Sequence, residues 1–399
     1  MARLPIYRES LVLLGSYLPL AATLLKVHLS TCRYLRVSSL ETLDGWLAEL
    51  LKRGGSDLHL KAQAVPRIRV NGDLVLLRAE LVTPDDTMSI ARYAMGEEMW
   101  AGFVRRHEAD FAYRRTGLGR FRVNAFLQRG SVSMVFRAVS MNPPTVKELG
   151  LPESISKIAE EHRGLVLVTG PTGSGKSSTL AAMVNHINST RDAHIVTIED
   201  PLETLHQDKR SIVNQREIGF DTQDYATAMR AAMRQDPDVI LVGEMRDLET
   251  VTAAIQAAET GHLVLSTLHT TGAAETIIRV VDFFPPHLQQ QIRVSLAGTL
   301  KGIICQRLVK TKDGTSRVPA LEIMIANGRT MQCVVDPMKT YDLREIIKEG
   351  SFYGMTTFDQ SLRDLYKSGT ISLEDALDNA TNAHDLKLSI GEITELASL

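Results

Sequence analysis

The segment Gly170-Pro-Thr-Gly-Ser-Gly-Lys-Ser177 constrains the fold of this chain more than any other feature. It follows an apolar run at 165–169 that predicts a strand, and it opens a stretch that predicts a helix. A glycine-rich turn in that context wraps a phosphate with its backbone N–H groups, and the helix N-terminus adds partial positive charge. Because pattern, strand and helix agree, a chance glycine-rich turn is the weaker interpretation. The chain is expected to bind and hydrolyse a nucleoside triphosphate.

Each residue type in this loop has a chemical task. Lys176 is expected to bridge the β- and γ-phosphates, and Ser177 is expected to bind Mg²⁺ through its hydroxyl. The predicted cofactors are therefore a nucleoside triphosphate and Mg²⁺. We expect nucleotide binding by nine consecutive residues, namely Gly170, Pro171, Thr172, Gly173, Ser174, Gly175, Lys176, Ser177 and Ser178.

The sequence around the loop predicts an α/β core. Apolar strands at 165–169, 194–198, 239–242 and 263–267 alternate with helical stretches. Near-continuous apolar runs are typical of strands that are buried on both faces of a parallel sheet. One intervening helix carries an apolar stripe that includes Met229 and Met233, which we interpret as core residues.

A smaller α/β domain is predicted upstream, over residues 41–140. Residues 41–53 have helical apolar spacing, 84–108 look helical, and Asn71-Gly72 predicts a hairpin turn. Strands are expected at 57–60, 67–70, 110–115, 120–127 and 131–138. Asn142-Pro-Pro-Thr145 predicts a linker over 141–155, followed by the core over 156–330 and a helical C-terminal region over 331–399.

Residues 1–40 are interpreted as an extension outside the folded unit, either disordered or in contact with a membrane. The apolar run at 11–25 is shorter than the ~20 residues that a spanning helix needs. It is similar to a signal-peptide core, but no clear cleavage site follows it. A peripheral membrane-contact helix is the alternative interpretation.

Charge and cysteine content favour a cytoplasmic protein without a nucleic-acid partner. The net charge is −2, so no global basic excess points to nucleic acid. The three cysteines, Cys32, Cys305 and Cys333, are far apart and form no CxxC pair. A zinc knuckle or a disulfide framework is therefore not expected.

Two acidic residues follow predicted strands and are the candidate catalytic carboxylates. Glu199 is the preferred general base, and Asp200 beside it is alternatively a cap of the next turn. Glu244 ends the second strand, where it would polarise water or support the metal shell. Gly243 stands where an Asp is usual, so the metal would be held mainly by Ser177, water and another carboxylate. An ordinary acid at a sheet edge is the alternative for each.

Histidines and arginines supply further candidates. His262 and His269 flank the strand at 263–267, so they are expected near its opposite ends. His269 follows the carboxyl end and would sense the γ-phosphate, whereas His262 would fix a loop or a subunit contact. The small domain carries Arg120, Arg122, Arg129 and Arg137, and alternation places Arg120 and Arg122 on one strand face. They would stabilise the transferred phosphate or form a solvated basic face.

The order of these motifs resembles the secretion-type ATPases, and within them the type IV pilus retraction ATPases of the PilT/PilU group. The resemblance covers roughly residues 41–399. Besides the phosphate loop it rests on Ile198-Glu-Asp-Pro201, Asp236-Pro-Asp-Val-Ile-Leu-Val-Gly-Glu-Met-Arg-Asp247, Gly261-His262, Thr267-Leu-His269, Gly55-Ser-Asp-Leu-His59, Gly119-Arg-Phe-Arg-Val-Asn124 and Gly354-Met-Thr-Thr-Phe-Asp359.

The resemblance implies a RecA-like P-loop ATPase core, an N-terminal PAS-like domain, and a homo-hexamer with ATP at the domain interface. It implies catalytic roles for Glu199, Glu244, His262 and His269, metal binding by Ser177 and Glu244, and contact of Arg120 and Arg122 with the nucleotide. Gly243 is usual in this family and so does not argue against hydrolysis.

The resemblance also implies a function and partners. The expected function is pilus retraction and twitching motility, driven from the cytoplasmic face of the membrane on an inner-membrane platform protein. A paralogous retraction ATPase is a further expected partner. The alternatives are an accessory ring that regulates a principal retraction ATPase, and a DNA-translocating ATPase, against which the acidic balance argues.

Two features depart from the family pattern. The stretch Thr330-Met-Gln-Cys-Val-Val-Asp-Pro337 does not match the Ala-Ile-Arg-Asn-Leu-Ile-Arg-Glu-type motif of retraction ATPases, and residues 1–40 have no counterpart. The chain also lacks the four-cysteine zinc element of pilus-assembly and type II secretion ATPases. That difference favours the retraction side of the family.

Overall fold

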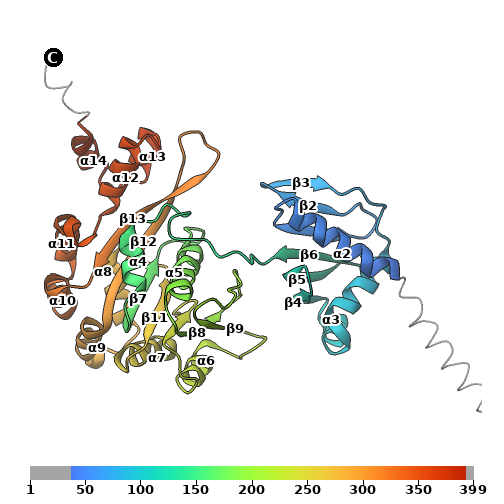
Figure 1. The fold of residues 1–399 in the computed structure, drawn as a ribbon, viewed down its shortest axis with the longest axis horizontal. Helices are drawn as coiled ribbons and strands as arrows, with labels where there is room; N and C mark the ends of the chain where they lie inside the picture. Colours follow the sequence, from blue (N-terminus) through green and yellow to red (C-terminus); the bar gives the residue numbers. More distant parts are fainter. Residues whose placement is uncertain (1–36, 392–399) are drawn as a thin grey trace, which may run out of the picture. The chain divides into compact units, whose positions relative to one another are not determined.

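The computed structural model describes residues 37–391 and divides the chain into two compact units, which meet in the sequence between Val139 and Ser140. Figure 1 shows the helices and strands of both units. The expectation of a disordered or membrane-contacting extension falls mainly on residues 1–36, which lie outside the described residues. Within the described residues the first helix is α2, which begins at Val37, a few residues before the predicted start.

The first unit is built on an antiparallel sheet with the strand order β3-β2-β1-β6-β5-β4. The predicted Asn71-Gly72 turn joins β2 to β3, with Val70 paired to Asp73. The sequence analysis missed β3, whose four residues are all exposed. The strands are β1 (Asp57–Lys61), β2 (Arg67–Val70), β3 (Asp73–Leu76), β4 (Glu108–Arg115), β5 (Gly119–Gln128) and β6 (Ser131–Ala138).

Helices α2 (Val37–Lys52) and α3 (Pro84–Arg106) share one core with this sheet. Thr83 caps α3 in a reciprocal capping box with Asp86, which typically stabilises a helix start by ~1 kcal/mol. The helix is interrupted at Gly96, where φ is 72°. On β5 the side chains of Phe121 and its alternate neighbours face the core, so Arg120 and Arg122 share the other face.

The second unit contains a mixed sheet with the strand order β13-β12-β7-β11-β10-β8-β9. The six strands from β12 to β9 pair with one another in parallel. The edge strand β13 pairs antiparallel to β12. The strands are β7 (Gly164–Thr169), β8 (His194–Glu199), β9 (Ile212–Glu217), β10 (Val239–Val242), β11 (Leu263–Leu268), β12 (Leu300–Lys310) and β13 (Arg317–Ile325).

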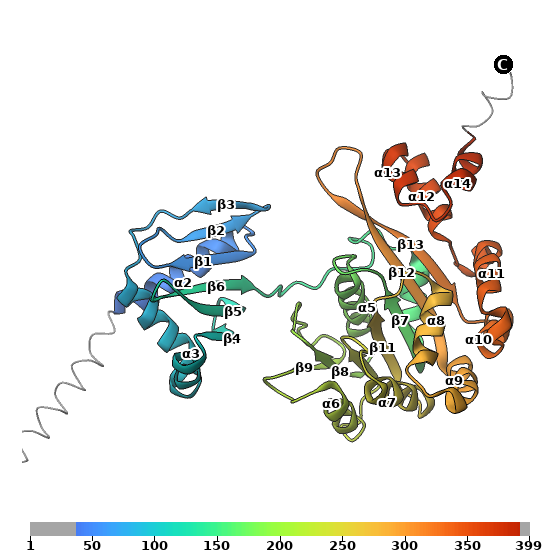
Figure 2. The ribbon, with the colours of Figure 1, turned by 180° about the vertical axis from the view of Figure 1, so that it is seen from behind.

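Helices cover both faces of this sheet (Figure 2). On β7, Leu165 and Leu167 join the core that contains α6 to α9, whereas Val166 and Val168 join the core that contains α4 and α5. Met229 is fully buried and Met233 packs against the same core, as predicted. The helices are α4 (Glu153–Ala159), α5 (Lys176–Thr190), α6 (Tyr225–Ala232), α7 (Leu248–Glu259), α8 (Ala273–Asp282) and α9 (Pro286–Thr299).

The structure differs from the sequence-based division in two places. Val146, Leu151 and Ile155 are buried in the second unit, so much of the expected 141–155 linker packs as part of that unit. The hairpin of β12 and β13 was not predicted as strands. Asp313-Gly314 in its turn was the available signal, because this dipeptide favours hairpin turns.

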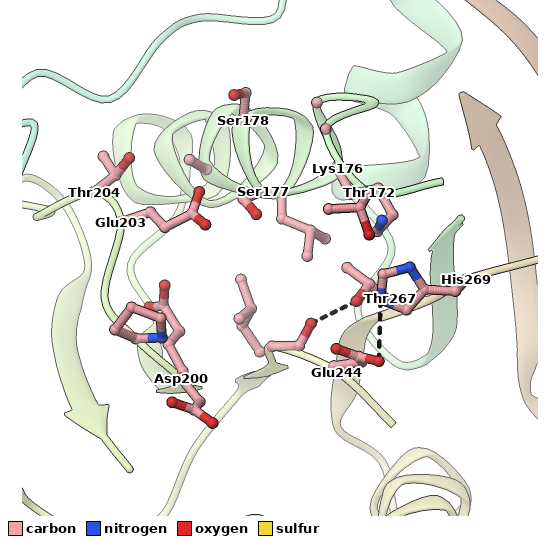
Figure 3. Close-up of a pocket in the computed structure, with 18 of the residues that line it drawn as sticks. Thr172, Lys176, Ser177, Ser178, Asp200, Glu203, Thr204, Glu244, Thr267 and His269 are labelled. Atoms are coloured by element: carbon pink, nitrogen blue, oxygen red, sulfur yellow. Dashed lines mark hydrogen bonds and ion pairs between the residues drawn. The ribbon is translucent and has the colours of Figure 1, made fainter. Parts of the chain in front are cut away.

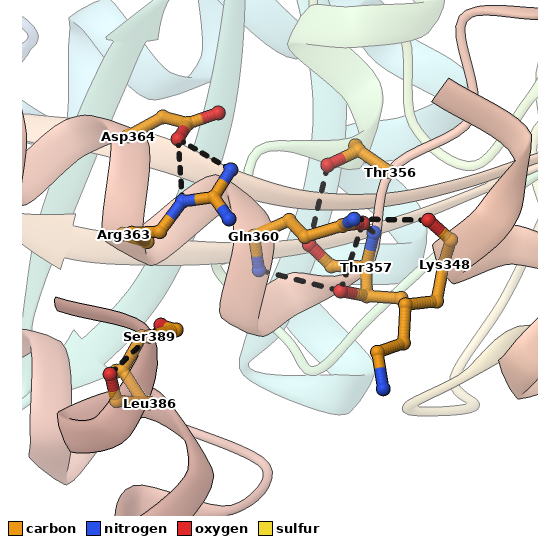
Figure 4. A network of polar contacts seen from close by, with 8 residues as sticks. All are labelled: Lys348, Thr356, Thr357, Gln360, Arg363, Asp364, Leu386 and Ser389. Carbon is orange, nitrogen blue, oxygen red and sulfur yellow. Dashed lines mark hydrogen bonds and ion pairs between the residues drawn. The ribbon is translucent and has the colours of Figure 1, made fainter. Parts of the chain in front are cut away.

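The C-terminal region is helical, as predicted, and the structure places the expected helix at α12 (Phe358–Lys367). Thr357 and Gln360 form a capping box at its start, and Gln360 Nε2 also donates to the Lys348 carbonyl at 3.0 Å (Figure 4). The other elements are α10 (Gly328–Val335), α11 (Leu343–Glu349), α13 (Leu373–Asp378), α14 (Ala383–Ile390) and the 3₁₀ helices η1 (Pro337–Asp342) and η2 (Gly350–Tyr353).

The finding on membrane spans concerns residues 37–391. Within that range, every helix is too short or too polar to traverse a bilayer.

Candidate nucleotide-binding site

A cleft of about 540 Å³ lies at the carboxyl ends of the central strands of the second unit (Figure 3). The phosphate loop and α5 form one wall, and the segments after β8, β10 and β11 form the other. Ligands of open α/β sheets bind in this position, because the loops that follow parallel strands converge there.

Gln306 on β12 packs against the phosphate loop and α5. A Cβ atom at Gly170 would lie 2.3 Å from the Gln306 carbonyl oxygen, and the φ of Gly170 is +147°. Only glycine fits that position. The Gln306 side chain also accepts a hydrogen bond from Thr179 Oγ1 at 2.7 Å, which fixes the first turns of α5 against β12.

Lys176 is the first residue of α5, and its ammonium group lies within the loop. Nζ donates to the carbonyl oxygens of Gly170 and Pro171 at 2.9 and 3.1 Å. Burial lowers the pKa of Lys176, and the negative charges of Glu244 and Glu203 oppose this shift. A cation that is held beside the helix N-terminus suits binding of a phosphate anion.

Glu199 is the last residue of β8, and its side chain lines the cleft opposite α5. Thr197 Oγ1 donates to Glu199 Oε1 at 2.6 Å, and Gln215 Nε2 donates to the same oxygen at 3.3 Å. Burial raises the pKa of Glu199 to about 7, although these hydrogen bonds act in the opposite direction. A carboxyl group with this pKa is suited to accept a proton near neutral pH.

Glu244 follows β10 and forms two ion-pair contacts. Its Oε1 lies 3.1 Å from His269 Nε2, and its Oε2 lies 2.8 Å from an Arg246 guanidinium nitrogen. Burial acts to raise the pKa of Glu244, but the hydrogen bonds and positive charges of Arg246 and His269 keep it below the ordinary value. Glu244 is therefore held as a carboxylate at neutral pH, whereas Glu199 titrates near pH 7.

The structure gives a physical reason for glycine at position 243. A Cβ atom there would lie 3.0 Å from Tyr225 Oη and 3.3 Å from the Ile198 carbonyl oxygen. An aspartate would force these groups to move. Tyr225 occupies the space beside this turn and lines the same cleft.

The structure brings most of the predicted site residues together, but not all. Glu199, Glu244 and His269 line one cleft with loop residues Thr172, Gly173, Gly175, Lys176, Ser177 and Ser178. His262 lies before β11, at the end away from the cleft, and its Nδ1 contacts the Ala257 carbonyl oxygen at 2.9 Å. A catalytic role for His262 stays a prediction that this cleft does not support.

The predicted arginines belong to the first unit. Arg120 and Arg122 lie on β5, and Arg137 on β6 forms an ion pair with the buried Asp57 at 2.7 Å. Arg129 lies in the turn between β5 and β6, with a φ of 52°. Because the cleft belongs to the second unit, contact of Arg120 and Arg122 with a nucleotide stays a prediction.

Several residues that shape the cleft were missed by sequence reasoning. Gln306 and Arg317 come from the unpredicted hairpin, and no local signal identifies them. Thr204 and His206 follow Glu199 closely, so proximity to that motif was an available signal. Burial lowers the pKa of His206 to about 4, which keeps its ring neutral.

A phosphate-binding loop at the end of a parallel strand, with two carboxylates of different pKa across the cleft, defines a P-loop nucleoside triphosphatase. Comparison with known proteins identifies the family of this nucleoside triphosphatase. The family model described as type II/IV secretion system protein matches residues 39–353. The chain therefore belongs to the type II/IV secretion system protein family, in its PilT/PilU group, and is an ATP hydrolase.

Individual relatives agree with this assignment. The chain is 45% identical over 334 residues to the type IV pilus retraction ATPase PilT of Pseudomonas aeruginosa, covering 84% of this chain and 96% of that one. It is 41% identical over 341 residues to the type IV pilus ATPase PilU of the same organism, covering 86% and 89%. A crystal structure of the pilus retraction motor PilT with bound ADP matches with a TM-score of 0.78 and 44% identity, covering 86% and 98%. The RecA-like core, the smaller N-terminal α/β domain and the helical C-terminal region are thus confirmed.

Proposed function

We propose that this chain is the ATP-hydrolysing motor of type IV pilus retraction and that it works as a homo-hexameric ring. The observation that carries the proposal is the cleft, in which a phosphate loop faces a carboxyl group poised to titrate near pH 7. Similarity to PilT over most of both chains supports retraction as the process that hydrolysis drives.

In the proposed site, ATP lies with its phosphates on the loop and Mg²⁺ beside them. The Ser177 hydroxyl and the Glu244 carboxylate are oxygen donors, which Mg²⁺ prefers, and both line the cleft. No cluster of three or more His, Cys, Asp or Glu side chains within residues 37–391 has the geometry of a metal site. A metal that arrives with the nucleotide and keeps several waters fits this donor set.

Four side chains have separate tasks in the proposal. Lys176 neutralises charge on the β- and γ-phosphates. Glu199 accepts the proton of the attacking water. His269 contacts the Glu244 carboxylate and senses the γ-phosphate by a hydrogen bond. Mg²⁺, when bound, supplies charge stabilisation at the phosphate oxygens.

Arg120 and Arg122 are proposed to stabilise the transferred phosphate, from the same chain or from a neighbouring subunit. Both lie on the face of β5 opposite the core. Guanidinium groups bind phosphate oxygens in a forked geometry.

The proposed partners are an inner-membrane pilus platform protein and a paralogous retraction ATPase. The ring would act at the cytoplasmic face of the cell membrane. Deleting the gene should abolish retraction of labelled pili and twitching motility. Retraction that continues with only reduced force would instead assign the chain to an accessory ring, and unchanged retraction would contradict both functions.

Hydrolysis should depend on pH through Glu199. The base acts as a carboxylate, and its pKa of about 7 means that protonation removes it as the pH falls below that value. The kcat/KM for ATP should therefore rise roughly fivefold from pH 6 to pH 7, reach roughly tenfold by pH 8 and level off above about pH 8. ADP binding measured over the same range separates this titration from that of the nucleotide. A profile that is flat from pH 6 to pH 8 contradicts the assignment.

A further inference from the structure

The side chain of Gln215 on β9 joins the proposed general base to the loop that lines one side of the cleft. Its Nε2 donates to Glu199 Oε1 at 3.3 Å and to the Thr204 carbonyl oxygen at 2.9 Å. Its Oε1 accepts from the backbone N–H of His206 at 2.8 Å. One amide thus makes three hydrogen bonds, two of them to the backbone on either side of Leu205.

The strand pairing explains why Gln215 reaches this position. In the parallel register of β8 and β9, Gln215 pairs with Thr197, which lies two residues before Glu199. Side chains two residues apart on a strand share a face. Thr197, Glu199 and Gln215 therefore project to the same side of the sheet.

The two hydrogen bonds to Glu199 define the orientation of its carboxyl group. Thr197 Oγ1 and Gln215 Nε2 both donate to Oε1. No hydrogen bond to Oε2 is found from any residue between 37 and 391. With one oxygen held by two donors, Oε2 is the oxygen left to accept a proton from water.

We propose that Gln215 is a positioning residue for ATP hydrolysis, which presents Oε2 of Glu199 to the attacking water and ties that carboxylate to the 204–206 backbone. The inference rests on the proposed role of Glu199. In the step concerned, the water oxygen bonds to the γ-phosphorus, its proton passes to Oε2, and the bond from phosphorus to the ADP oxygen breaks.

The charged surroundings of Glu199 set the background against which Gln215 acts. Burial and the charges of Glu203, on the loop, and Glu217, on β9, raise the pKa of Glu199. Around the same cleft lie Asp200 after β8, Tyr225 of α6, Glu244 with Arg246 after β10, and Lys176 of α5. A hydrogen-bond donor favours the carboxylate, so the Gln215 amide works against the acidic neighbours.

Two substitutions separate positioning from loop anchoring. Gln215→Leu removes all three hydrogen bonds. Gln215→Glu keeps an acceptor for the His206 N–H but removes both donors and adds a negative charge beside Glu199. Asn214→Leu is the matched control, because Asn214 is the adjacent amide residue on β9 and contacts His194 instead.

For Gln215→Leu we expect kcat to fall roughly tenfold, because a misplaced base lowers the rate of the chemical step. The acid limb of the pH–rate profile should move roughly half to one pH unit higher, and that of Gln215→Glu should move further. KM for ATP should change by less than about twofold in both variants, since neither removes a phosphate contact. Asn214→Leu should keep the wild-type profile.

The experiment uses the full chain and includes Glu199→Gln, so that two failures can be told apart. If Glu199→Gln is inactive while both Gln215 variants keep the wild-type acid limb and kcat, the positioning role is overturned and the base assignment stands. If Glu199→Gln hydrolyses ATP normally, the base assignment fails and the inference fails with it. Thermal melting of each variant checks that it is folded. If Gln215→Leu does not fold, the pH–rate profile of Gln215→Glu decides the result.

Discussion

Replacing Lys176 with alanine is expected to reduce the rate of ATP hydrolysis on the order of 10²- to 10³-fold. The ammonium group lies within the phosphate loop and, in the proposed complex, neutralises charge that grows on the β- and γ-phosphates. Steady-state phosphate release at saturating Mg²⁺ and ATP measures the effect, and nucleotide binding should weaken in parallel.

The loss should come from the missing charge rather than from unfolding. Within residues 37–391, Nζ donates hydrogen bonds to the Gly170 and Pro171 carbonyl oxygens alone, so the α/β core should keep its melting temperature within a few degrees. Lys348→Ala is the matched control, because that side chain is 63% exposed in the C-terminal region. Turnover by Lys176→Ala equal to that of the wild type would contradict the assignment of the cleft as the site of ATP hydrolysis.

The second large effect is expected from Glu199→Gln. The substitution keeps the shape of the side chain and removes the proton acceptor, so turnover should fall roughly 10²- to 10⁴-fold while ATP still binds. Stability should not fall at pH 8. Because the pKa of Glu199 is raised on folding, its buried carboxylate is unfavourable above pH 7, and a neutral amide avoids that cost.

Controls for this variant distinguish the two carboxylates of the cleft. Glu349→Gln, in an exposed ion pair with Arg329, should behave as the wild type. Glu244→Gln should raise the Mg²⁺ concentration needed for half-maximal activity, because Glu244 is the proposed metal ligand. If Glu244→Gln instead reproduces the whole loss and Glu199→Gln keeps turnover, the two roles are exchanged.

The parts of the site that were predictable from sequence are those in which neighbours in the chain are neighbours in space. The phosphate loop, the strand before it and α5 form one continuous segment, and Glu199 and Glu244 each end an apolar strand. Their meeting in one cleft follows from the parallel order of β7, β11, β10 and β8.

The parts that escaped prediction depend on contacts between distant residues. Gln306 supports α5 from 127 residues beyond Thr179, and it lies on a hairpin whose strands carry no strict apolar alternation. Gln215 acquires its position only through the register of β9 beside β8. The packing of residues in 141–155 escaped prediction for the same reason, because the Pro-Pro pair signals a break in local structure and not what the following residues pack against.

Retraction in a deletion strain that expresses Glu199→Gln tests the central claim most directly. Pilus retraction would be followed by imaging labelled pili, with equal levels of wild-type and variant protein verified in the cells. If hydrolysis in this cleft powers retraction, the wild-type gene restores retraction and the Glu199→Gln gene does not. Full restoration by the inactive variant would contradict the account.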